Sequence, residues 1–127
     1  IMLSVIVTSD KDLIKLPENC DLFIIFSENL KDKVELPKRT KELKINNSYN
    51  EELIFPEGLT HLTLGQNFNH SLDCLPQGLL YLCIRSNINS LNSEQSYTLN
   101  NLPNTLQTLI IGKKYNKTLD MFKRFTK

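Results

Sequence analysis

Hydrophobic residues recur along the chain with a period of about 20 residues. The clearest marker of this period is an apolar residue followed by proline, and successive markers are 20, 19, 20 and 27 residues apart. We call these dipeptides the anchors. They are Leu16-Pro17, Leu36-Pro37, Phe55-Pro56, Leu75-Pro76 and Leu102-Pro103. A nearly constant period of this length is typical of a solenoid built from stacked repeats.

Two hydrophobic columns follow each anchor, seven and nine residues after it. The first column holds Phe23, Leu43, Leu62, Leu82 and Leu109, and the second holds Ile25, Ile45, Leu64, Ile84 and Ile111. Apolar residues at alternate positions indicate a short β-strand with one buried face. One such strand cannot bury its apolar side alone, so neighbouring repeats are expected to stack. We predict a leucine-rich-repeat-like solenoid, with a parallel sheet of about six short strands on the concave face and a convex side of extended segments and turns with little helix.

The repeats account for the chain as a single domain. We expect a partial repeat at 1–15, repeats at 16–35, 36–54, 55–74, 75–101 and 102–121, and a C-terminal cap at 122–127. The fourth repeat is longer than the others, and its polar segment 89–101 predicts an exposed loop because lengthening a surface loop costs little free energy.

An asparagine follows a large apolar residue 14 residues after four of the anchors. These asparagines are Asn50, Asn69, Asn89 and Asn116, and the residues before them are Tyr49, Phe68, Ile88 and Tyr115. Asparagine tolerates left-handed backbone in turns and can hydrogen-bond neighbouring backbone groups. We expect these four residues to form a structural ladder between repeats.

The combined pattern, L-P-x-x-L-x-x-L-x-[IL]-x-x-x-[FYI]-N-x-x-L, resembles the FNIP repeat, a relative of the leucine-rich repeat. The segments "FPEGLTHLTLGQNFNHSL" and "LPNTLQTLIIGKKYNKTL" carry the resemblance most clearly. FNIP repeats are abundant in social amoebae and in giant viruses that infect amoebae. They often accompany an F-box or a kinase, which implies a substrate-recognition or host-interaction role within a larger protein.

A partner is expected to bind the strand positions that alternate with the buried columns. These positions lie six, eight and ten residues after each anchor, so their side chains point away from the core. The predicted partner-binding residues are Leu22, Ile24, Phe26, Glu42, Lys44, His61, Tyr81 and Arg85, and Asn46 lies among them. Tyrosine and arginine are common in binding hot spots.

The amino-terminal end of this predicted face is strongly apolar because it includes Leu22, Ile24 and Phe26. An exposed apolar patch usually marks an interface. Three interpretations remain open: the patch is covered by the chain itself or a dimer mate, it binds a different protein, or the first repeat has another register.

Charge and composition exclude several function classes. The 15 basic and 14 acidic residues leave a net charge of +1, so no nucleic acid partner is expected. No apolar run reaches the length of a membrane span. The three cysteines lack metal-ligand spacing and fit a cytoplasmic protein, or the host cytoplasm for a viral one. We expect no metal, cofactor, small-molecule substrate or catalytic residue.

Two hypotheses follow for the function. The first is a non-enzymatic protein-interaction module that uses the concave sheet face. The alternative is a structural solenoid that self-associates as a homodimer.

Overall fold

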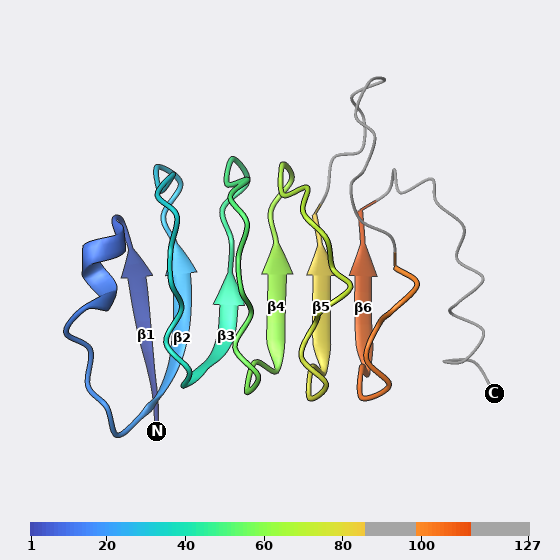
Figure 1. Ribbon diagram of the computed structural model, residues 1–127, viewed down its shortest axis with the longest axis horizontal. Coiled ribbons are helices and arrows are strands. Elements are labelled where there is room, and N and C mark those ends of the chain that lie inside the picture. Colours follow the sequence, from blue (N-terminus) through green and yellow to red (C-terminus); the bar gives the residue numbers. More distant parts are fainter. Residues whose placement is uncertain (86–98, 113–127) are drawn as a thin grey trace.

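The chain forms a single-layer parallel sheet backed by extended return segments (Figure 1). The computed structural model describes residues 1–85 and 99–112. Six strands pair in sequence order, and every described neighbour pair is parallel. They are β1 (Met2–Val7), β2 (Asp21–Phe26), β3 (Thr40–Lys44), β4 (His61–Leu64), β5 (Tyr81–Ile84) and β6 (Thr108–Ile111), with one 3-10 helix, η1 (Asp10–Leu13). The predicted solenoid with six short strands and little helix is confirmed.

Four of the five anchor prolines close a hydrogen-bonded turn that leads the chain into the next strand. The carbonyl oxygens of Pro37, Pro56, Pro76 and Pro103 each accept a hydrogen bond from the backbone N–H three residues later, at 3.1 to 3.2 Å. Proline cannot donate a backbone hydrogen bond, so it marks the end of the return segment and the strand begins after it. This recurring turn explains why the anchor dipeptide sets the period.

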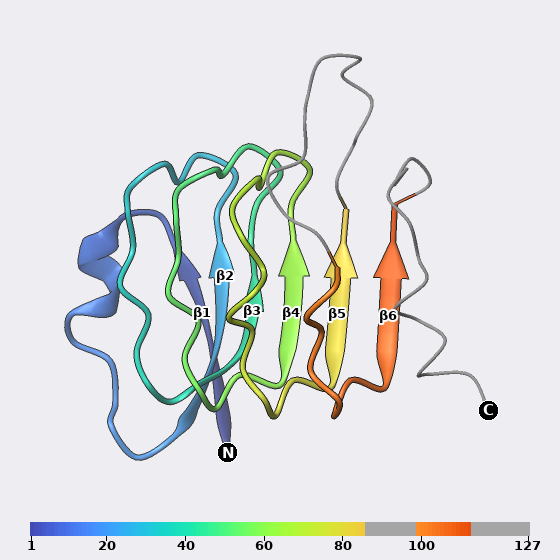
Figure 2. The same cartoon turned by 45° about the vertical axis from the view of Figure 1, so that its right-hand side comes forward.

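Figure 2 shows the return segments running along one side of the sheet, and the buried side chains of the core lie between the two. Leu43, Leu62 and Leu82 occupy equivalent positions on β3, β4 and β5 and are at most 1% exposed. Each buried leucine contributes about 1.5–3 kcal/mol relative to exposure, so the free energy of folding comes mainly from this stacking between repeats.

The first full repeat has a different register from the predicted one. Ile24 pairs with Leu43, although it lies eight residues after its anchor and Leu43 lies seven after its own. A bulge between Leu22 and Phe23 absorbs the difference, since Thr40 and Glu42 of β3 face these two consecutive residues. The sequence prediction therefore assigned the residues from Leu22 to Phe26 to the wrong faces.

Leu22, Ile24 and Phe26 are consequently buried in the core, at 0, 0 and 3% exposure, and the prediction that they face a partner is wrong. The segment from Leu22 to Phe26 is apolar at every position, so alternation could not select the inner face. Phe26 instead packs edge-on against Tyr49, with ring centroids 4.8 Å apart.

The turn after β3 contains a buried asparagine. The Asn46 side-chain amide donates to the carbonyl oxygens of Ser27, at 2.5 Å, and Leu30, at 3.2 Å, while its oxygen accepts from the Ser48 N–H. Asn46 is 8% exposed, so the prediction that it lies on the partner face is also wrong. β3 ends at Lys44, and the alternation of side chains does not continue past the end of a strand.

The predicted asparagine ladder is only partly within the described residues. The Asn50 side-chain oxygen accepts a hydrogen bond of 2.8 Å from the Asn69 N–H of the next repeat. The expected left-handed backbone is wrong for both residues, because no described non-glycine residue has a positive φ. Asn89, Asn116 and the predicted cap at 122–127 lie outside the described residues.

Candidate functional site

The sheet has one face that points away from the core, which we call the open face. Strand pairing aligns its side chains in two rows across the repeats. The first row runs Ser4, Phe23, Glu42, His61, Tyr81 and Thr108, and the second runs Ile6, Ile25, Lys44, Thr63, Cys83 and Ile110. Because neighbouring parallel strands are about 4.8 Å apart, side chains within a row contact one another directly.

An imidazole and a phenol stack at the centre of the first row. The rings of His61 and Tyr81 lie 5.6 Å apart between centroids and are inclined by 22°. The His61 Nδ1 lies 2.9 Å from the Thr60 hydroxyl and 4.0 Å from the nearer Glu42 carboxylate oxygen. The His61 side chain remains 45% exposed and that of Glu42 31% exposed, so both are accessible to a partner.

Cys83 of the second row affects the pKa of Tyr81, one of the two stacked residues. Burial raises the pKa of the Tyr81 phenol above its usual value, Cys83 raises it further through an electrostatic interaction and a hydrogen bond, and Arg85 opposes this rise. Tyr81 is therefore a neutral hydrogen-bonding group at physiological pH. Cys83 itself belongs to the second row but is only 7% exposed.

The structure brings together five of the eight predicted partner-binding residues. Glu42, Lys44, His61 and Tyr81 lie on adjacent strands of the open face, and Arg85 is exposed directly after β5. The carboxylate of Glu42 belongs to the first row, whereas the cations of Lys44 and Arg85 lie closer to the carboxyl ends of the strands. The Glu42 carboxylate and these two cations thus lie on different sides of the face.

Sequence reasoning missed the apolar residues that the first repeat contributes to the open face. Phe23 pairs with Glu42, and Ile25 pairs with Lys44, so both lie beside the charged centre. On β1, Ile6 extends the patch and is 65% exposed. The missed signal was the length from anchor to strand, which is one residue greater in this repeat than in the next.

The described part of the chain offers no metal centre. Within residues 1–85 and 99–112, no three His, Cys, Asp or Glu side chains gather closely enough to hold a metal ion. Among the same residues, no helix has the length and apolar character needed to cross a membrane.

Comparison with known proteins identifies the repeat. The FNIP Repeat family matches residues 49–87, which include β4, β5 and the Phe68-Asn69 pair. A comparison with curated proteins finds no match. The match contains "FPEGLTHLTLGQNFNHSL", the segment on which the sequence resemblance rests most clearly. Residues 49–87 of this repeat solenoid are therefore similar to the FNIP Repeat family, which supports the resemblance seen in the sequence.

Proposed function

We propose that the chain is a non-enzymatic protein-interaction module and that its open face binds a protein partner. The single observation that carries this proposal is the half-exposed row of Phe23, Glu42, His61 and Tyr81 across four consecutive strands. Aromatic side chains are enriched at interface cores, and tyrosine is among the commonest hot-spot residues.

The chemistry of the row supports an extended peptide segment as the binding partner. Phe23 and Ile25 offer an apolar surface next to the Glu42 carboxylate, and the stacked rings follow on β4 and β5. A peptide lying across the strands would place an apolar side chain on Phe23 and a basic side chain between Glu42 and the ring face of Tyr81. An acidic residue of the peptide would then lie near Lys44 or Arg85.

A peptide-display selection against the immobilised chain tests this proposal. Selected peptides are expected to carry an apolar and a basic residue, and Glu42→Lys should weaken their binding at least about tenfold. The matched control is Glu57→Lys, which makes the same charge change on the return segments, and it should leave peptide affinity unchanged. Peptides that bind both variants as tightly as the parent would refute the use of the open face.

Self-association is the second candidate function. It is favoured by large aliphatic side chains exposed on the return segments at Ile14 and Ile54, at 72 and 88%. A soluble monomer seldom leaves such residues uncovered in one contiguous patch. Sedimentation equilibrium of the intact chain tests this function independently of any peptide ligand.

A further inference from the structure

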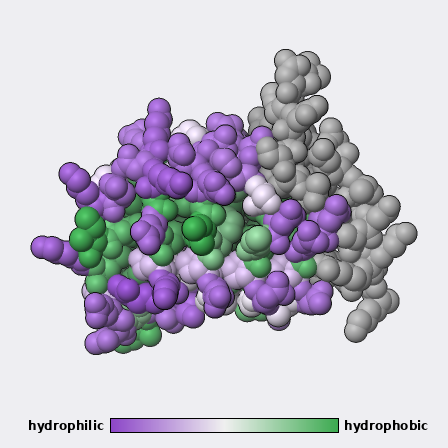
Figure 3. Space-filling model, in the orientation of Figure 1, coloured by the Kyte–Doolittle hydropathy of each residue, from purple (hydrophilic) through white to green (hydrophobic). Residues whose placement is uncertain are grey.

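The return segments form a second face, on the side of the core opposite the open face. A hydrophobic belt crosses this side of the molecule between two hydrophilic borders (Figure 3). Ile14 and Ile54 are its most exposed members, and Leu16, Leu36 and Phe55 of the anchors are partly buried along it. The belt runs from one repeat to the next, so it forms only when the repeats stack.

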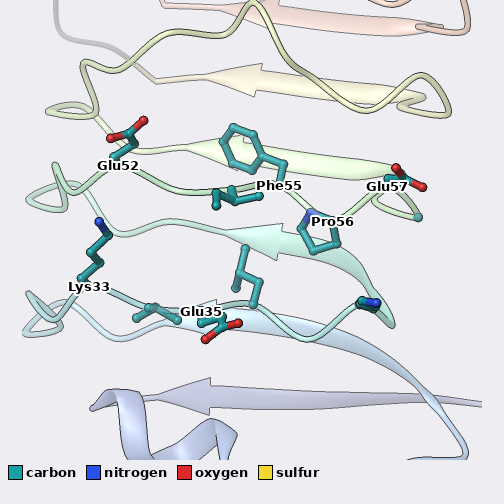
Figure 4. A pocket seen from close by; sticks show the side chains of 11 residues that line it. Lys33, Glu35, Glu52, Phe55, Pro56 and Glu57 are labelled. Carbon is teal, nitrogen blue, oxygen red and sulfur yellow. The ribbon is translucent and has the colours of Figure 1, made fainter.

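A groove of about 880 Å³ interrupts the belt between segments 33–38 and 52–58 (Figure 4). Val34, Leu36 and Phe55 line its apolar part, and Ile54 stands beside it with 88% of its surface exposed. The groove is therefore an apolar depression with a protruding aliphatic side chain on one wall. The depression and the protruding Ile54 side chain therefore lie on the same face of the chain.

The two walls carry opposite charges at equivalent positions. Because the walls are one repeat apart, 19 residues, Lys33 corresponds to Glu52 and Lys38 to Glu57. Figure 4 shows Lys33 and Glu52 near one end of the groove and Glu57 near the other. The one ion pair among the described residues joins His61 and Glu42, so these four side chains do not pair across the groove. One wall carries two lysines with Glu35 between them, and the charged residues that line the other wall, Glu52 and Glu57, are both acidic.

This arrangement is self-complementary for one orientation of two copies. If two grooves face each other about a two-fold axis parallel to the groove, the two lysines of each copy meet the two glutamates on the facing wall of the other. Lys33 then lies against Glu52 of the second copy, and Leu36 lies against Phe55 of the second copy. An axis across the groove would instead oppose Lys33 to Lys38 and Glu52 to Glu57, which is repulsive.

We propose that the return face binds a second copy of this chain through a two-fold contact along this groove. In a two-fold interface the same patch serves both partners, so each lysine–glutamate contact occurs twice. The contact also places Ile54 of each copy opposite Glu35 of the other. It leaves both open faces exposed to solvent, and it is therefore independent of the partner-binding function proposed for them.

Sedimentation of the intact chain from about 1 µM to about 500 µM covers the dissociation constants of small transient interfaces. A reversible monomer–dimer equilibrium is expected. Lys33→Glu and Glu52→Lys should each raise the dissociation constant at least about tenfold, because each opposes like charges twice. Ile54→Asp should do the same by placing a carboxylate opposite Glu35 of the other copy. Lys44→Glu, on the open face, is the matched control and should leave dimerisation unchanged.

Mixing the two charge variants gives the sharpest test. The Lys33→Glu protein has acidic side chains on both walls, and the Glu52→Lys protein has basic side chains at both positions. Each should be monomeric alone, and an equimolar mixture should form a heterodimer. Unchanged far-UV circular dichroism and melting temperatures would exclude loss of fold as the cause of dissociation.

Three results would overturn the proposal. They are a parent chain that stays monomeric over the whole range, a dimer that neither charge variant weakens, and two monomeric variants that fail to associate when mixed. A dimer lost on Phe23→Asp but kept in Lys33→Glu would assign the contact to the open face instead. The affinity of the open face for peptides is measured separately, and its outcome does not depend on these results.

Discussion

Asn46→Ala should destabilise the chain more than any other single asparagine substitution in the described turns. The substitution removes two hydrogen bonds donated to the Ser27 and Leu30 carbonyl oxygens and one accepted from the Ser48 N–H. Since Asn46 is only 8% exposed, water replaces these bonds poorly. At about 0.5–1.5 kcal/mol for each bond, the expected loss in the free energy of unfolding is about 2–4 kcal/mol. This is a large part of the 5–15 kcal/mol typical of a domain.

Urea denaturation followed by far-UV circular dichroism measures this loss, provided the slope of the transition stays constant. The matched control is Asn47→Ala. Asn47 is exposed, and its side-chain oxygen accepts a single bond of 3.3 Å from the Gln66 N–H, so its loss should stay below about 1 kcal/mol. If the two variants unfold at the same urea concentration, the Asn46 hydrogen bonds between repeats do not contribute the expected free energy of unfolding, and the prediction is refuted.

Three further substitutions test other parts of the stack. Gly65→Ala would place its Cβ 2.0 Å from a backbone oxygen of the preceding repeat, so we expect a loss of about 3 kcal/mol in urea denaturation. Gly78→Ala meets nothing within 4 Å and should be nearly neutral; equal losses would contradict the close approach. Asn50→Ala removes the hydrogen bond to the Asn69 N–H and should cost about 1 kcal/mol, and an unchanged melting temperature would rule out that contribution. Burial raises the pKa of Tyr49 to about 12 from 10.0, so its neutral form stabilises the fold up to about pH 10 and this stability is lost as pH rises through 12. Tyr49→Phe should show a smaller fall in melting temperature between pH 9 and pH 11 than the parent, and an identical fall would refute this pH linkage.

The stacked sheet could be predicted from the sequence because two independent patterns coincide. The anchors set the repeat length, and the alternation in β3, β4 and β5 assigns faces without ambiguity. In "HLTL", for example, the buried leucines and the half-exposed His61 and Thr63 follow the expected order. The open-face positions of Glu42, Lys44, His61 and Tyr81 follow directly from this alternation.

Two parts of the molecule could not be predicted, for different physical reasons. The run from Leu22 to Phe26 is apolar throughout, so both faces satisfy the hydrophobic pattern and only packing against Tyr49 distinguishes them. Asn46 follows the end of β3, where the chain turns inward and buries a polar side chain among carbonyl groups. A turn of this kind depends on the preceding repeat, which local sequence patterns do not describe. The grooved return face likewise depends on the spacing between segments one repeat apart.

The strictly sequential order of the sheet also determines how the chain can fold. Each described strand contacts only the strands that precede and follow it in the sequence. Every pairing therefore closes a loop of about one repeat, and no early contact has to wait for a distant segment. Folding can begin at any well-packed pair of repeats and then extend to the neighbouring repeats in both directions. Amide hydrogen exchange should accordingly reveal a gradient, with the slowest amides in β3, β4 and β5 and faster opening toward β1.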